Sequence, residues 1–222
     1  MRTKRKERCD GRETREAILE AAEDEFAERG YALASMREIC RKAGVNSALA
    51  SRYYESKEGL YRTVAKRLFG DLGKPMADLA STVADEASWQ TAIKTWVEDF
   101  LYMTIPTAKA QKRCAGLFKQ EVTNPTKFHN EFKRDFGKRV YDSLRTLIAM
   151  KVKDEVKVEL VTSSVWAQVS VYALADHKWH LSFRPKGVKD EEWRRQVGKY
   201  IVNRVIIEAE ASNRKIVKSV KS

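Results

Sequence analysis

The chain has 222 residues, of which 43% are apolar and 33% charged, and its formal net charge is +12. This length suits one large domain or two small ones, and the apolar content supports a packed core, which excludes wholesale disorder. The basic excess favours a polyanionic partner, such as DNA, RNA or an anionic membrane surface, without choosing among the three.

The cysteines are odd in number and widely scattered, at Cys9, Cys40 and Cys114. With no CxxC pair or Cys/His cluster, they predict reduced thiols rather than a disulfide framework or a zinc site. The histidines are His129, His177 and His180. None of them lies at the spacing from an acid or a cysteine that metal ligands have, so we expect no metal and no cofactor.

The basic N-terminus, Arg2 to Arg8, is not followed by an apolar run, so it does not have the pattern of a secretory signal. No uninterrupted apolar stretch is long enough to span a bilayer. We expect a cytoplasmic protein with no membrane partner.

Helical periodicity dominates the first quarter of the chain. Residues 12–29 carry one apolar stripe, and Gly30 is expected to end that helix by adopting a positive φ. The stripe consists of Ile18, Leu19, Ala22 and Phe26.

Three shorter helices follow. Ser35 is a candidate N-cap, with Glu38 in capping-box position, for a helix that breaks at Gly44. Asn46 or Ser47 can cap a third helix to about Tyr54. Ser56 can cap a fourth, whose apolar residues Leu60, Val64 and Leu68 lie four apart.

Beyond Pro75, longer apolar stripes predict buried helices and no β alternation is found. An all-α protein of about nine or ten helices is predicted. Its C-terminal helices are expected at 89–101, ending before Pro106; about 114–122; 128–152; 156–177; and 191–214.

The segment from Ser35 to Leu60 has the spacing of a helix-turn-helix. Gly44 can take the positive φ of a tight turn, and Val45 can pack between the two helices. The second helix begins with small or polar residues that would let its N-terminal end enter a major groove. By spacing alone, two ordinary core helices are as good an interpretation.

Several motifs in this region resemble the DNA-binding domain of TetR-family regulators. They are Ile-Leu-x-Ala-Ala-x-x-x-Phe from Ile18, Gly30-Tyr31, Ala43-Gly44-Val45, and Tyr-Tyr-x-Ser-Lys-Glu-x-Leu from Tyr53. The resemblance implies a homeodomain-like three-helix, helix-turn-helix domain at residues 12–72. It also implies a larger helical domain at 73–222 that holds an effector and forms the dimer.

The resemblance also assigns residues to a DNA interface. The recognition helix would run from Asn46 to Tyr54. The residues closest to base edges would be Ser47, Ala48, Leu49 and Ser51, and the phosphate contacts would be Ser35, Arg37, Tyr53 and Lys57.

Some of these roles have plain alternatives. Arg52 is a further candidate contact or a solvated surface arginine, and Leu49 could touch a thymine methyl or pack inward. Ala50 and Ser51 depart from the bulkier residues usual in the family, which puts the base contacts in doubt more than the domain. The basic tail could follow a minor groove or remain a solvated, disordered tail.

The C-terminal region offers candidates for an effector pocket and a dimer interface, each with buried core as the alternative. The stretch Cys114 to Thr126 also resembles the TetR subgroup with a CerR-like C-terminal domain. Candidate pocket residues are Trp96, Phe100, Met103, Phe118, Phe132, Phe136 and Trp166. Candidate interface residues are Val165, Val169, Tyr172, Ile201 and Val205.

These features predict a homodimeric transcription regulator that binds a palindromic double-stranded operator, because two-fold dimers match palindromic half-sites. A repressor released by an unknown small-molecule effector is the expected form; an activator of the same fold is the alternative. No catalytic motif supports an enzyme. A basic helical protein that binds RNA or an anionic surface lacks the RNP, KH or lysine-faced helix patterns.

Overall fold

The computed structural model describes the backbone of residues 2–106, 108–174 and 184–219, and the side chains of 11–70, 74–106, 108–174 and 184–211. All regular structure in these residues is helical, as predicted. The helices are α1 (Arg2–Leu33), α2 (Met36–Ala43), α3 (Ser47–Tyr54), α4 (Lys57–Asp78), η1 (Leu79–Thr82), α5 (Glu86–Thr104), α6 (Lys109–Thr123), α7 (His129–Phe132), the π-helical turn η2 (Lys133–Gly137), α8 (Lys138–Ala149), α9 (Glu155–Leu174) and α11 (Asp190–Ser219).

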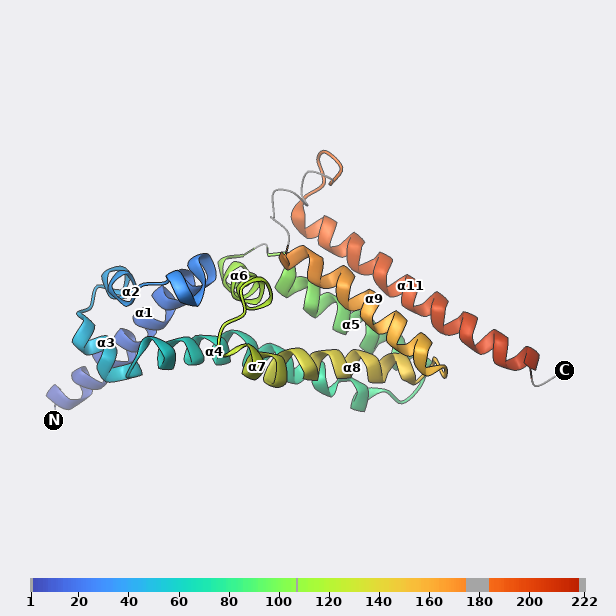
Figure 1. Cartoon of the computed structure of the whole chain (residues 1–222), viewed down its shortest axis with the longest axis horizontal. Coiled ribbons are helices and arrows are strands. Elements are labelled where there is room, and N and C mark those ends of the chain that lie inside the picture. The colour runs from blue at the N-terminus through green and yellow to red at the C-terminus, as the bar shows by residue number, and fades with distance from the viewer. Residues whose placement is uncertain (1, 107, 175–183, 220–222) are drawn as a thin grey trace.

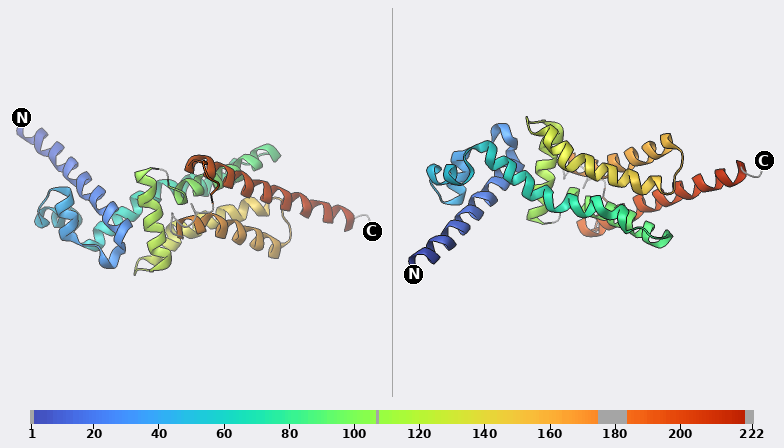
Figure 2. Two further views of the ribbon diagram at one scale, coloured as in Figure 1. Left: turned by 90° about the horizontal axis from the view of Figure 1, so that it is seen from above. Right: turned by 90° about the horizontal axis from the view of Figure 1, so that it is seen from below.

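The molecule is elongated, with the N- and C-termini at opposite ends (Figure 1). Helices α1, α2 and α3 gather at one end, and α5, α8, α9 and α11 form a bundle at the other. Helix α4 runs from the first group into the second, and α6 lies across the junction. Figure 2 shows the N-terminal end of α1 projecting away from the other helices.

Helix α1 begins at Arg2, ten residues before the predicted start, so the backbone of the basic tail is helical rather than disordered. The side chains of residues 2–10, on which the minor-groove hypothesis depends, lie outside the described residues. The predicted stripe is confirmed, since Ile18, Ala22 and Phe26 are fully buried. The predicted break at Gly30 is also confirmed, with φ 71° and ψ 172°.

Helix α4 is continuous past the expected boundary between residues 72 and 73, and it contains Pro75. Proline lacks the N–H that would bond one turn back, so this turn of α4 has one hydrogen bond fewer. At its N-terminal end, Leu60 and Val64 are fully buried, and further along Phe69 is 4% exposed. A single helix therefore contributes to both groups of helices.

The C-terminal bundle is centred on α5. Asp85 and Ser88 form a reciprocal capping box at its start. Two buried indoles then join α5 to α8: Trp89 Nε1 donates to Leu147 O at 2.7 Å, and Trp96 Nε1 donates to Val140 O at 3.1 Å. These bonds satisfy polar atoms that would otherwise destabilise the core.

Some C-terminal helix boundaries differ from the prediction. Helix α6 starts at Lys109 rather than near residue 114. The long helix predicted for 128–152 is divided by η2 into α7 and α8, because a four-residue apolar repeat does not reveal where one extra residue enters a turn. The last described residue of α9 is Leu174.

Charged and polar contacts fix α6 against α1 and α4. Arg113 of α6 pairs with Glu23 at 2.7 Å and with Asp24 at 2.5 Å, both on α1. On the other side, the hydroxyl of Tyr61 in α4 donates to the carboxylate of Glu121 in α6, and both residues are at most 2% exposed. Burial and the neighbouring carboxylate raise the pKa of Tyr61. Helix α6 is therefore fixed to α1 and α4, and it also packs against α5 and α9 of the C-terminal bundle.

Candidate nucleic-acid interface

The turn between α2 and α3 depends on Gly44, which has φ 67° and ψ 29°. Its N–H and that of Val45 cap the last carbonyls of α2, with Val45 N donating to Cys40 O at 3.0 Å. An L side chain is strained at this φ, whereas glycine is not. Val45 is half-buried and packs against the core between the helices, as predicted.

The first turn of α2 is held from two sides. Ser35 is the N-cap, accepting from Glu38 N at 3.4 Å. The predicted return bond from Glu38 does not form, because Glu38 pairs with Arg41 instead. Ser35 N–H donates to Glu25 of α1 at 3.3 Å, and Glu25 also binds Lys42 at 2.9 Å. The fully buried Glu25 therefore anchors both ends of α2 to α1.

Helix α3 has one exposed and one buried face. Asn46 is its N-cap and accepts from Leu49 N at 2.8 Å. Ala50 is fully buried, so the small side chain that departs from the family pattern lets α3 pack closely on the core. Leu49 is half-buried. The exposed residues are Ser47, Ala48, Ser51 and Arg52.

Residues three and four positions apart are neighbours on a helix surface. Ser51 therefore adjoins Ser47 and Ala48, and Arg52 adjoins Ala48, so these four residues form one continuous face of α3. Ser35 and Arg37 are also exposed, at the start of α2. Arg37 and Arg52 make no hydrogen bond or ion pair with a described residue, so both guanidinium groups are available to a polyanion. The exposed residues of α3, together with Ser35 and Arg37, are called the α3 face below.

Two predicted phosphate contacts, Tyr53 and Lys57, are engaged within the chain. Tyr53 is half-buried, and the Arg15 guanidinium lies 5.0 Å from its ring centroid. Lys57 Nζ donates to Ala32 O at 3.3 Å and lies 4.8 Å from the ring centroid of Tyr31. Burial lowers the pKa of Lys57. These contacts were not visible in the sequence, since the residues that form each of them lie far apart in the chain.

The candidate pocket residues other than Met103 form a contiguous aromatic cluster. Phe100 packs against Trp166, with ring centroids 5.0 Å apart, and against Phe118 at 6.0 Å. Five of the seven residues are at most 2% exposed, and Phe132 and Trp166 are half-buried. Phe132 and Phe136 line a groove between α4 and the α7–α8 segment, with a volume of about 490 Å³. A pocket role stays a prediction for the remaining candidates, which are Trp96, Phe100, Met103, Phe118 and Trp166.

Four of the five candidate interface residues need a correction. Val165, Val169, Ile201 and Val205 are at most 3% exposed and fill the core of this chain, which was the alternative interpretation. Tyr172 is half-buried and stays a candidate for the interface. The helical periodicity found the apolar side of each helix but not the second, outward apolar stripe.

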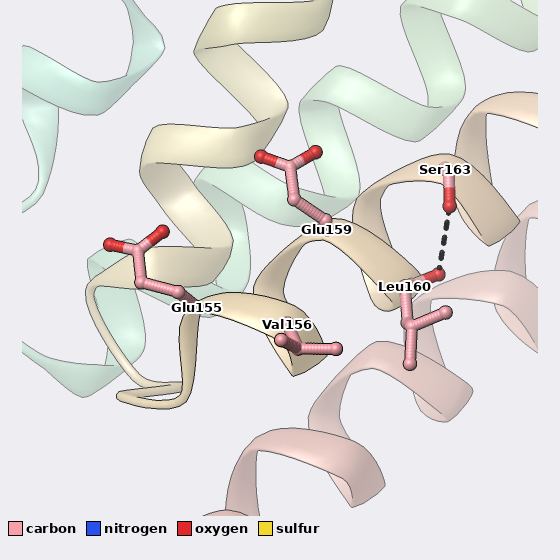
Figure 3. A pocket seen from close by; sticks show the side chains of 5 residues that line it. All are labelled: Glu155, Val156, Glu159, Leu160 and Ser163. Atoms are coloured by element: carbon pink, nitrogen blue, oxygen red, sulfur yellow. Dashed lines mark hydrogen bonds between the residues drawn. The ribbon is translucent and has the colours of Figure 1, made fainter.

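That outward stripe runs along α9 and α11. Val156 and Leu160 are 69% and 64% exposed, and on α11 Tyr200 and Ile207 are 62% and 49% exposed. Val156, Leu160 and Ser163 line a shallow depression (Figure 3), from which the carboxylates of Glu155 and Glu159 turn away toward α8. There Arg145 pairs with both. These exposed apolar residues of α9 and α11 are called the α9–α11 face.

Among the described residues, no three His, Cys, Asp or Glu side chains gather as a metal site. No helix in the same part of the chain is long and apolar enough to span a membrane. His177 and His180 lie outside the described residues.

Comparison with known proteins shows what the N-terminal part of the chain is similar to. Residues 18–64 match the profile of bacterial regulatory proteins of the tetR family. A curated relative, the probable HTH-type transcriptional regulator YttP of Bacillus subtilis (strain 168), is 27% identical over 81 residues, which is 36% of this chain and 39% of that protein. The matched part of the chain thus spans less than half the length of this relative.

Solved structures with the same fold cover most of the chain. A TetR-like transcriptional regulator from Rhodococcus sp. RHA1 has a TM-score of 0.65 and 18% identity, over 87% of this chain and 96% of that one. FadR from Bacillus subtilis, in complex with stearoyl-CoA, has a TM-score of 0.60 and 14% identity, over 84% and 96%. At such identities these structures establish the fold alone. The CerR-like resemblance stays a prediction.

Proposed function

Since residues 18–64 match the TetR family profile and most of the chain shares the fold of a TetR-like regulator, we propose that this protein is a sequence-specific DNA-binding transcriptional regulator. The observation that carries this proposal is the α3 face. Four small or cationic side chains are exposed along one side of α3, directly after a glycine turn. Such a surface fits a major groove, where short side chains let the helix approach base edges closely.

Within this proposal, the residues divide by role. Ser47, Ala48 and Ser51 read base edges. Arg37 and Arg52, which have no charged partner among the described side chains, bind phosphates, and this sets register without reading sequence. Tyr53 and Lys57 act mainly by holding α3 and α4 against α1, given their contacts within the chain.

We further propose that the protein acts as a homodimer joined through the α9–α11 face. One short recognition helix reads too few base pairs for useful specificity, so a two-fold partner is needed. The α9–α11 face supports a second copy because it exposes large apolar residues on two adjacent helices, and such patches are costly to leave in water.

The C-terminal domain is proposed to bind a small-molecule effector that releases the protein from its operator. FadR, which shares the fold, was solved with stearoyl-CoA bound. An effector acts by binding better to the conformation that does not fit DNA. Repression follows if the operator overlaps a promoter, whereas activation by the same fold remains the alternative. We propose a cytoplasmic location, since that is where an operator would be bound.

Selection of bound duplexes from a random library tests the proposal and does not require the operator sequence in advance. We expect enrichment of one inverted repeat with half-sites about one helical turn apart. The enriched duplex should outcompete random duplex at moderate salt. Equal binding of enriched and random duplex would contradict a regulator, and preference for hairpin RNA or anionic vesicles would favour the other two polyanions.

A further inference from the structure

A groove separates α4 from α7, η2 and α8, away from both the α3 face and the α9–α11 face. Its volume is about 490 Å³. This lies within the range of roughly 300–1,000 Å³ that is typical of small-molecule sites. The groove therefore has the size of a ligand site, and its lining indicates which ligand it would take.

Three phenylalanines form the apolar part of the lining. The ring centroid of Phe69 lies 4.9 Å from that of Phe132 and 4.9 Å from that of Phe136, and the last two rings are 5.5 Å apart. Phe136 belongs to η2, and Phe132 directly precedes it. Single π-helical turns occur often at functional sites, because they redirect side chains that a regular helix would place elsewhere.

The side of the groove formed by α4 is basic. Arg62, Lys66, Gly70 and Lys74 follow one another at four-residue spacing, so they share one side of the helix. Lys66 and Lys74 are exposed and make no hydrogen bond or ion pair with any side chain that the structure describes. Gly70 leaves the middle open, since the nearest atom to a Cβ added there is Lys66 Cγ at 3.9 Å.

The acidic residues of the lining do not neutralise these lysines, because each already has partners. Glu131 pairs with Arg62. Asp135 pairs with Arg134 at 2.7 Å. Glu121 accepts from Tyr61 and, at 2.7 Å, from Thr126. The partners of Glu121 are neutral, but among the described lining residues Arg62, Lys66, Lys74 and Arg139 outnumber the three carboxylates, so the net charge of the lining is positive.

We propose that this groove binds a small amphipathic anion, with its apolar body against Phe69, Phe132 and Phe136 and its carboxylate, sulfonate or phosphate held by Lys66 and Lys74. The further claim that this ligand is the effector rests on the proposed function. The groove shares two residues with the sequence-predicted pocket and leaves the remaining aromatic cluster as core.

The position of the groove gives the ligand a route to the DNA-binding end. Its two sides belong to α4, which follows the α3 face, and to the α7–α8 segment of the C-terminal bundle. Tyr61 and Glu121, which join α4 to α6, also line it. A ligand that contacts both sides favours one separation of α4 and α8, and so selects among positions of the DNA-binding helices.

Two fluorescent probes test the site directly on the full chain. Anilinonaphthalene sulfonate carries an anionic group on an aromatic body, and phenylnaphthylamine is the same body without the sulfonate. We expect the sulfonate to bind the wild type more tightly. Lys66→Glu/Lys74→Glu should weaken sulfonate binding by about tenfold, because two attractive charges become repulsive, and should remove the preference over the neutral probe.

Two further variants complete the test. Gly70→Phe fills the groove and should abolish binding of both probes, while a helix tolerates phenylalanine at this position better than glycine. Lys186→Glu/Lys189→Glu makes the same charge change at exposed lysines near the start of α11 and should bind as the wild type does. Equal sulfonate binding by all four proteins would overturn the groove as its site, as would a lack of preference for the anion.

The regulatory consequence is measured separately, on the selected duplex. Saturating sulfonate should weaken duplex binding by the wild type and leave Gly70→Phe unaffected. If both proteins bind the duplex and neither responds to the probe, the effector role is refuted while the regulator stands. If no duplex is enriched at all, the proposed function fails, whatever the probes show.

Discussion

Side chains on the α3 face differ in how firmly the fold holds them. Ser47, Ala48 and Ser51 stand on a helix whose buried side is fixed by Ala50, so their directions are set by the backbone. Arg37 and Arg52 are long, exposed and unpaired among the described residues. The small residues can therefore specify sequence, whereas the arginines supply attraction that varies with salt.

Arg37→Ala tests this division at the scale of one residue. It should weaken binding to the selected duplex and to random duplex by the same factor, and reduce the slope of log affinity against log salt by about 1. Filter binding over a salt series measures both. Arg195→Ala, which removes the same charge from α11, should leave the slope unchanged. A loss confined to the selected duplex would instead make Arg37 a base-reading residue.

At the scale of elements, the helix-turn-helix is held by its turn and by Glu25 on α1. The turn needs a left-handed residue at Gly44, and Glu25 binds the backbone at one end of α2 and Lys42 at the other. Helix α3 begins within a few residues of the end of α2, so the turn geometry sets the angle at which α3 is presented.

Gly44→Ala should destabilise the protein by about 1–2 kcal/mol through the cost of a positive φ. Gly137→Ala is the matched control, because both glycines have open space around a new Cβ but Gly137 has φ −55°. It should leave stability unchanged or raise it slightly. Urea unfolding measures both variants. Equal effects of the two substitutions would show that the turn does not require its φ.

At the scale of the whole molecule, two groups of helices are joined by α4 and by α6. Arg113 fixes α6 to α1, and Glu121 fixes it to α4. The C-terminal bundle then presents the α9–α11 face outward. In this arrangement, the surfaces proposed for dimerisation and for DNA binding are separate and are connected through the helices between them.

Leu160→Glu places a charge in the α9–α11 face and should convert the dimer to a monomer, because an unpaired carboxylate is costly to bury. Light scattering after gel filtration measures the mass. Leu33→Glu is the matched control: Leu33 is 77% exposed at the end of α1, away from that face, so its variant should stay dimeric. A dimer for both variants would move the interface elsewhere.

Sequence patterns predicted the helices and their caps better than the contacts that each helix makes with distant parts of the chain. The α1 stripe, the caps at Ser35 and Asn46 and the extent of α3 were all readable, because local periodicity and capping chemistry determine them. Contacts between distant segments were not readable, such as those of the Lys57 ammonium with the Tyr31 ring and the Ala32 carbonyl. The phosphate contact of Lys57 stays a prediction.

The same limit applies to the C-terminal domain. Val165 and Val169 were recognised as apolar, yet periodicity does not distinguish a stripe that packs within the chain from one that faces outward, as Val156 and Leu160 do. The groove was also missed, although Arg62, Lys66, Gly70 and Lys74 at four-residue spacing on α4 were a signal that could have indicated it.

The most direct test of the central claim places one charge on the α3 face. Ala48 and Ala110 are both exposed and both occupy the second position of a helix, where a glutamate suits the helix dipole equally well. Ala48→Glu should lose at least about 100-fold in affinity for the selected duplex at unchanged melting temperature, because it sets a carboxylate against phosphates and base acceptors. Ala110→Glu should bind as the wild type does. Wild-type affinity in Ala48→Glu would contradict DNA recognition by α3.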